Sequence, residues 1–344
     1  MKIGKLHSIG AFVLVGGALA VAPFSPAAAI TVKAETASGG CAYNAMVLTA
    51  KYAPKEGVEI QVNDGKTLTK SMLLVGQGKL DIASAVPAPY EFMKEGAAMY
   101  KSIGKEKSAA LAKKLRGMYG FFCGAFLPMV WNESPIKTWE DMKGKKVFTG
   151  PPSGAAALDM EQFIEGMTGF KPNVDYTAVR LNWGAAQPAM RDGQLDVYMR
   201  PMQVPSALVE ELQAIRPLRI LPVTQDDLKK PGMVKLINKA GNLLVTLKSG
   251  SYPGVVNNDR DMPMPGLGLM QVAGAHVPDD VIYKITKSFF SHIDEIHKNN
   301  PQFKDLTLQN PFAVLNVPLH PGAYKYFKEM GVKIPEKLMP PGMS

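Results

Sequence analysis

Hydrophobic and polar positions follow a repeating order of strand and helix along the chain. Three segments alternate as half-buried strands do, and the residues between them are apolar at helical spacing. The strands are TVKAETA, VEIQV and LDIASAV at 31–37, 58–62 and 80–86, and the helical spacing is carried by Met46, Ala50 and Ala53 and then by Leu68, Met72 and Val75. This order of strand, helix, strand, helix, strand predicts a parallel sheet.

The same order recurs further along the chain. Strands are predicted at 145–150, 176–181 and 195–199, with helices at 155–166 and 183–193 between them. Ser38 precedes Leu80 by 42 positions, Ser153 precedes Leu195 by the same 42, and GKLDI at 78–82 matches GQLDV at 193–197. Gly-x-Leu-Asp alone is common, but agreement over five consecutive elements favours two similar α/β lobes.

Two apolar segments indicate where the lobes join. FLPMVW at 126–131 and MPGLGLMQVA at 264–273 are apolar enough to be strands that run through a hinge. We therefore expect lobe 1 to comprise residues 30–125 plus 262–344, and lobe 2 to comprise residues 126–261. Two chain crossings predict closure by a hinge motion, which a ligand that contacts both lobes would favour.

The first 29 residues have the composition of a secretory signal peptide. Lys2 and Lys5 precede an apolar run from Ile9 to Ala22, and small residues follow up to Ala29. The run is shorter than the roughly 20 residues that span a bilayer, so we expect a cleaved signal and an exported, soluble protein.

The chain remains basic after the signal is removed. Of its 39 basic residues, 37 remain without the two signal lysines, against 30 acidic residues. This excess of positive charge favours anionic partners. The basic residues are scattered, which argues against nucleic acid.

The two cysteines leave two structural possibilities open. Cys41 and Cys123 could form a disulfide after export, or could be two buried thiols. The five histidines show no ligand spacing near either cysteine, so no metal site is expected. Cys41 opens a predicted helix, a place that lowers a thiol pKa, but a nucleophile there would need His276 or His320 brought close by folding. We therefore rank an enzyme well below a binding protein.

Candidate binding residues cluster at the ends of the predicted strands, where α/β proteins bind ligands and where helix N-termini offer N–H groups to an anion. Neither nucleotide-loop pattern is present, and NDGKT at 63–67 lacks the upstream glycine of a P-loop. Arg200, after the strand LDVYM, either grips a carboxylate or lies on the surface, and Trp183 is either a cavity wall or core. The candidate ligand-binding residues are Ser38, Gly39, Gly40, Cys41, Tyr43, Asp64, Lys66, Thr67, Ser84, Ser153, Gly154, Ala155, Asn182, Trp183 and Arg200.

The chain resembles the TAXI family of TRAP transporter solute receptors over essentially all of its mature length. The resemblance is carried by ASGGCAY, GQGKLDIA, DMKGKKVFTGPPSG and RDGQLDVYM, and most specifically by GSYPGV, VPDDVIYKITKSFF and VPLHPGAYKYFKEMG. It implies a periplasmic binding protein of the two-lobed type II fold, which closes on a small carboxylate such as glutamate or 2-oxoglutarate and presents it to a TRAP permease driven by a cation gradient. Ser38, Gly39, Gly40 and Tyr43 match the family's first binding turn, and Ser153 and Gly154 match its second.

Several positions depart from the family pattern. Ala42 and Asn44 flank Tyr43 where a tyrosine pair and a proline are usual, and Cys41 replaces a small polar residue. Ala155 replaces a threonine of the second turn, NDGKT replaces a Thr-Gly-Gly-Ser turn, and Arg200 stands where an apolar or small residue is more usual. These changes suggest a different anion.

We therefore expect a monomeric periplasmic receptor that binds a small anionic solute, works with membrane TRAP permease subunits, and uses no cofactor, metal or nucleic acid. A binding protein for sensing or scaffolding without a permease is the first alternative, and an exported cysteine enzyme is the second.

Overall fold

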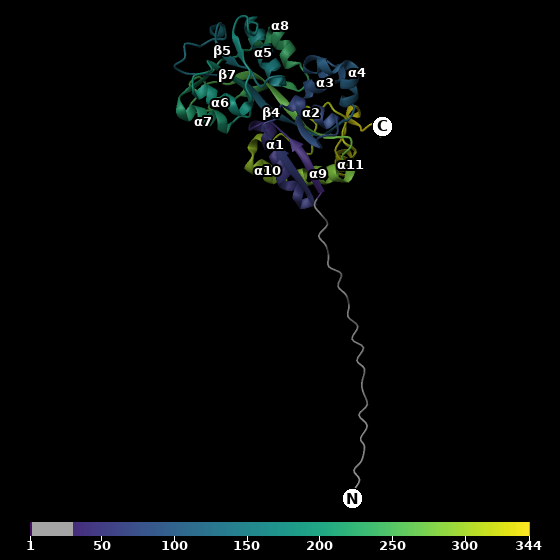
Figure 1. Cartoon of the computed structure of the whole chain (residues 1–344). Coiled ribbons are helices and arrows are strands. Elements are labelled where there is room, and N and C mark those ends of the chain that lie inside the picture. The colour runs from purple at the N-terminus through teal and green to yellow at the C-terminus, as the bar shows by residue number, and fades with distance from the viewer. Residues whose placement is uncertain (2–29, 344) are drawn as a thin grey trace.

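The computed structural model describes Met1 and residues 30–343, and it has an α/β fold built on one mixed, curled sheet (Figure 1). The strands follow the order β2-β1-β3-β10-β4-β7-β5-β6, while β8 pairs with β4 and β9 with β10. The strands are β1 (Ile30–Glu35), β2 (Val58–Asn63), β3 (Ile82–Ala85), β4 (Leu115–Trp131), β5 (Lys146–Phe148), β6 (Thr177–Val179), β7 (Val197–Met202), β8 (Leu218–Ile220), β9 (Asn242–Leu247) and β10 (Met262–Gly274). The predicted signal peptide falls outside the described residues apart from Met1.

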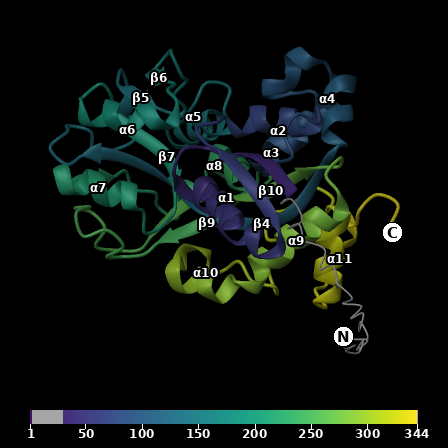
Figure 2. The same cartoon turned by 60° about the horizontal axis from the view of Figure 1, so that its bottom comes forward.

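Helices flank this sheet. They are α1 (Gly40–Tyr52), α2 (Leu68–Gly76), α3 (Pro87–Glu95), α4 (Lys105–Ala112), α5 (Ala155–Thr168), α6 (Trp183–Arg191), α7 (Ala207–Ile215), α8 (Pro231–Ile237), α9 (Asp279–Ser291), α10 (Ile293–Asn299) and α11 (Pro321–Glu329). Helices from the two ends of the described sequence pack together, since α9 contacts both α1 and α11 (Figure 2). None of the helices described combines the length and apolar character needed to span a bilayer.

The predicted repeat is confirmed by the strand topology. In the first half β1 pairs in parallel with β2 and β3, and in the second half β5 pairs in parallel with β6 and β7. The Asp of each Gly-x-Leu-Asp motif has the same role. Asp81 Oδ2 accepts from Lys33 N at 2.8 Å, and Asp196 Oδ2 accepts from Lys146 N at 2.8 Å. The motif recurs because each aspartate ties the start of the third strand to the first strand.

Two long strands connect the halves. β4 and β10 pair with each other, while β10 also pairs with β3 of the first half and β4 pairs with β7 of the second. They contain the two apolar segments predicted to form the hinge. The lobe boundaries at 125/126 and 261/262 remain predictions.

Each half has its own aromatic cluster in the core. Tyr119 on β4 stacks on Phe289 of α9, with ring centroids 4.7 Å apart. In the other half Trp139 packs on Phe163 of α5 at 4.5 Å. Large buried rings on both sides of β4 and β10 belong to one continuous hydrophobic core.

His320 caps helix α11 from a fully buried position. Its Nδ1 accepts from Gly322 N at 3.2 Å, and its Nε2 lies 3.0 Å from the Val277 carbonyl, so the neutral ring with hydrogen on Nε2 satisfies both contacts. Burial lowers the pKa of His320 from 6.5 to about 4, against a smaller opposing effect of Asp279. The ring therefore has a structural role at the start of α11.

We expect His320 to make the protein sensitive to acid. The pKa of His320 is lower in the folded protein than in the unfolded chain. The neutral ring therefore contributes about 3 kcal/mol to the free energy of unfolding. This contribution is fully present above pH 6.5 and is lost as the pH falls from 6.5 toward 4. His320→Asn keeps a capping oxygen but cannot titrate. The free energy of unfolding, measured in urea at pH 7.5 and at pH 5.0, should fall less between these pH values in the variant than in wild type. An equal fall in both proteins would contradict this role.

Candidate functional site

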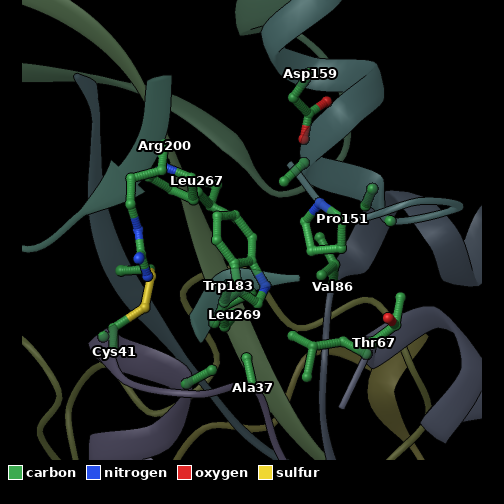
Figure 3. Close-up of a pocket in the computed structure, with 18 of the residues that line it drawn as sticks. Ala37, Cys41, Thr67, Val86, Pro151, Asp159, Trp183, Arg200, Leu267 and Leu269 are labelled. Atoms are coloured by element: carbon green, nitrogen blue, oxygen red, sulfur yellow. A yellow bond between two sulfur atoms is a disulfide. The ribbon is translucent and has the colours of Figure 1, made fainter. Parts of the chain in front are cut away.

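A cavity of about 80 Å³ lies where the two predicted binding turns approach each other (Figure 3). Eight of the predicted binding residues line it: Gly39, Gly40, Cys41, Thr67, Gly154, Ala155, Trp183 and Arg200. The other lining residues are Ala37, Ala42, Leu68, Thr69, Val86, Cys123, Phe126, Pro151, Ala156, Asp159, Pro201, Leu267 and Leu269. Both halves and both hinge strands therefore contribute to one cavity.

The Ser-Gly-Gly turn has a backbone that suits glycine. Gly39 and Gly40 have φ of 63° and 71°, in the left-handed region that other residues rarely adopt. A Cβ on Gly40 would also lie 3.4 Å from Nη2 of Arg200. The glycine pair thus lets the chain turn into α1 and lets the guanidinium approach the backbone.

The second turn is held against the first half by one hydrogen bond. Ser153 has φ of 60°, unusual for a residue with a side chain, and its carbonyl accepts from Thr69 Oγ1 at 3.0 Å. Thr69 belongs to α2, so this bond connects the two predicted lobes beside the cavity. Asn44 Nδ2 makes a second such connection by donating to Gln203 Oε1 at 3.1 Å. The structure is therefore a conformation in which the halves are in contact.

Removing the Thr69 hydroxyl should weaken this contact. Thr69→Val keeps the shape of the side chain but removes the donor, and one hydrogen bond contributes about 1 kcal/mol. We expect the free energy of unfolding, measured in guanidinium, to fall by about that amount. Thr69→Ser is the matched control and should retain the bond; a loss of stability in the Ser variant without a loss in the Val variant would point to the methyl group instead.

Four helices begin at the cavity. α1, α2, α5 and α6 each contribute first-turn residues to its wall: Gly40, Leu68, Ala155 and Trp183. None of the four has an acidic residue in its first turn or a side-chain hydrogen bond at its N-cap. The first N–H groups of a helix lack intrahelical acceptors and carry partial positive charge. The cavity wall is thus electropositive even before side chains are considered.

Arg200 adds a full positive charge to this wall. The sequence placed it at the end of a strand, either at the cleft or on the surface; in the structure it lies inside β7, which runs on to Met202, and is 6% exposed, so the surface interpretation is wrong. Its Nη1 donates to Tyr198 Oη at 3.0 Å, whereas Nε has no hydrogen-bond partner. Its Cζ lies 4.6 Å from the Trp183 ring centroid, a cation–π contact.

The Arg200 charge has no acidic partner within the part of the chain that the structure describes. No carboxylate of residues 30–343 lies within 4.0 Å of its nitrogens. Figure 3 shows the guanidinium reaching down toward Cys41, with the Trp183 indole beside it. A buried cation is unfavourable until an anion pairs with it, so Arg200 is suited to a planar acid group.

Asp159 of α5, 2% exposed, also lines the cavity and is already paired. Lys239 Nζ lies 2.6 Å from its Oδ1. Burial raises the pKa of Asp159, and the neighbouring Lys239 opposes that effect. Arg200 and Asp159 are the ionisable side chains among the lining residues described, and only Arg200 remains uncompensated.

A family model matches residues 36–331 of the chain. The chain belongs to the NMT1-like family. Solved structures with a similar arrangement include the alkanesulfonate-binding protein SsuA from Xanthomonas axonopodis pv. citri bound to MOPS, at 13% identity, 87% coverage of this chain, 83% of the other and a TM-score of 0.49. A TRAP periplasmic solute-binding protein from Citrobacter koseri with bound D-glucuronate matches at 14% identity, 88% coverage of each chain and a TM-score of 0.44.

In this NMT1-like chain the two cysteines form a disulfide. Cys41, in the first turn of α1, is bonded to Cys123 of β4, with Cα atoms 5.5 Å apart. The question left open by the sequence is thereby resolved, and Cys41 offers no free thiol for nucleophilic chemistry. The cavity-lining residues include no histidine, and residues 30–343 contain no group of three or more His, Cys, Asp or Glu that could hold a metal.

Seven predicted residues lie outside the cavity wall: Ser38, Tyr43, Asp64, Lys66, Ser84, Ser153 and Asn182. Ser84 is fully buried, and its Oγ contacts Thr36 Oγ1 at 3.1 Å and the Gln271 amide nitrogen at 3.1 Å, so it serves the sheet. Lys66 contributes its backbone, donating to the Thr36 carbonyl at 2.9 Å. Asp64, Ser153 and Asn182 are exposed, and Ser38 and Tyr43 are half-buried. None of these seven residues belongs to the cavity wall.

The sequence missed most of the apolar wall. Val86 follows β3, and Phe126, Leu267 and Leu269 lie in the hinge strands. In sequence these positions look like any buried strand residue, and only the folded arrangement distinguishes wall from core. Asp159 did offer a signal, because it is an acid that follows the apolar first turn of the helix after the second binding turn.

Proposed function

We propose that this protein is a periplasmic solute-binding receptor for a TRAP-type secondary transporter and that it captures a small carboxylate by closure of two lobes. One observation carries the proposal: the cavity between the halves is electropositive on all sides where helices begin, and it contains the buried, uncompensated Arg200. An anion supplies the charge that this site lacks.

Closure follows from how the cavity is built. Its wall combines residues of α1 and α2 with residues of α5, α6 and β7, so a bound anion contacts both halves. The Thr69 to Ser153 hydrogen bond forms only when those halves meet. Ligand contacts to both sides favour the closed form over the open one.

Membership of the NMT1-like family and the TAXI-like motifs support the transport role. The motifs GSYPGV, VPDDVIYKITKSFF and VPLHPGAYKYFKEMG favour the TAXI branch, and the signal-like first 29 residues favour the periplasm. The partners would be the membrane subunits of a TRAP permease, with the receptor acting as a monomer.

A thermal-shift screen of organic acids and amino acids tests the binding role. Because a ligand at a hundred times its Kd stabilises the native state by about 2.7 kcal/mol, the correct carboxylate should raise the melting temperature by roughly 5 °C or more. The matched amides should not. Absence of stabilisation by every anion in the screen would overturn the proposal.

The transport role has a separate test in the native host. Deleting the gene should abolish uptake of the identified carboxylate driven by a cation gradient, and the wild-type gene should restore it. Unchanged uptake in the deletion strain would instead favour the sensor without a permease.

A further inference from the structure

The cavity offers a ligand one uncompensated side-chain charge. Arg200 is the single uncompensated ionisable group among the described lining residues, since Asp159 is paired with Lys239 at 2.6 Å. A second carboxylate on the ligand would find only the partial charges of helix N-termini and no second side-chain cation, and a buried charge that is incompletely compensated is unfavourable. A ligand ammonium group also lacks an unpaired carboxylate.

Most of the wall away from Arg200 is apolar, apart from Thr67, Thr69, Asp159 and the Trp183 indole. Its apolar side chains include Val86, Phe126, Leu267 and Leu269, with Ala37 and Pro151 from the two turns. These side chains offer no hydrogen bond to a hydroxyl or carbonyl on the body of a ligand. In Figure 3 Leu267 and Leu269 lie beside Trp183, so an apolar surface continues from the group that stacks on the guanidinium.

The cavity is small. Its volume of about 80 Å³ compares with roughly 300–1,000 Å³ for sites that take drug-sized ligands. This size favours a carboxyl group with only a few more carbon atoms.

We infer that the solute is a short aliphatic monocarboxylate, whose carboxylate pairs with Arg200 and whose hydrocarbon body contacts Leu267, Leu269 and Val86. The inference rests on the proposed anion-binding function and names its substrate class. It differs from the glutamate or 2-oxoglutarate implied by the sequence resemblance, each of which has two carboxylates.

Isothermal titration of ligand-free wild-type protein tests the inference with compounds that differ in one property each. The short acids are propionate, butyrate and isobutyrate. Each comparison compound changes one property: succinate adds a second negative charge, 2-aminobutyrate adds an ammonium group, butyramide removes the charge, and octanoate lengthens the chain. We expect at least one of the three short acids to bind at least a hundredfold tighter than each of the four comparison compounds.

The possible results separate failure of the monocarboxylate inference from failure of the proposed function. Tighter binding of succinate or 2-aminobutyrate would overturn the monocarboxylate inference and leave an anion receptor intact. Equal binding of butyramide and butyrate would overturn the role of charge. Absence of binding by all the short acids, together with stabilisation by another anion in the thermal screen, would overturn the inference alone; no binding by any anion would overturn both.

A wall substitution provides a second readout. Val86→Leu adds one methylene group to the cavity wall, so butyrate should bind about tenfold more weakly while propionate is less affected. Val62→Leu, at a half-buried position outside the cavity, is the control and should change neither affinity. Equal weakening of both acids by Val86→Leu would contradict contact between Val86 and the hydrocarbon body.

Discussion

Arg200→Met is expected to weaken carboxylate binding at least a hundredfold while leaving the ligand-free protein as stable as wild type or more stable. The guanidinium is buried beside the cavity, its Nε is unpartnered, and no carboxylate among the described residues compensates it. Methionine fills similar space without the desolvation cost of a charge. Loss of binding with no loss of stability is what distinguishes a ligand-binding arginine from a structural one.

Two further variants sharpen this result. Arg200→Lys keeps the charge but loses the planar fork, so we expect about a tenfold loss of affinity or more. Arg219→Gln is the matched control, because Arg219 is half-buried with an unpartnered Nε but lies in β8 away from the cavity. Titration calorimetry and thermal melts on all three variants provide the comparison. A strongly destabilised Arg200→Met protein, or one that binds normally, would contradict the role assigned to Arg200.

Loss of the disulfide is expected to lower the free energy of unfolding by about 2–4 kcal/mol. The bond joins residues 82 positions apart and anchors the first turn of α1, which lines the cavity, to hinge strand β4. Without it the unfolded chain gains conformational freedom, and the Gly39–Gly40 turn loses its covalent attachment. We expect the Cys41→Ala/Cys123→Ala protein to unfold at lower guanidinium concentration than wild type.

Reducing agent provides the control for this prediction. Dithiothreitol should bring wild-type protein close to the double variant and should leave the double variant unchanged. Thiol titration of denatured, non-reduced wild type should find no free thiol. Two free thiols, or an unfolding midpoint insensitive to both the reductant and the substitutions, would contradict the disulfide.

Local pattern was sufficient to predict the order of the first five strands and helices in each half, from β1 to β3 and from β5 to β7. The equal spacing from Ser38 to Leu80 and from Ser153 to Leu195 identified the repeat, because each element has its own hydrophobic period and each Asp of the Gly-x-Leu-Asp motif makes the same contact. The turns were recognisable for a similar reason, since consecutive glycines before a helical segment indicate a left-handed backbone.

The cavity wall was only partly predictable because it depends on how distant segments meet. Arg200 was identified as a candidate, but its burial comes from pairing of β7 with β4, where it lies opposite Leu127. Ser84 lies within the expected strand, but its Oγ accepts a hydrogen bond from Gln271 Nε2 of β10 and takes no part in the cavity wall. Pairing between strands almost 190 positions apart has no local signature, so the sequence could not separate a wall residue from a core residue.

A crystal structure with 3-bromopropionate tests the central claim most directly. Bromine gives an anomalous signal that locates the hydrocarbon end, while the carboxylate is identified by its contacts. We expect the bromine peak beside Leu267 and Leu269 and the carboxylate within hydrogen-bond distance of the Arg200 guanidinium. A peak outside this cavity, or no peak in it at saturating ligand, would contradict capture of a short monocarboxylate by Arg200.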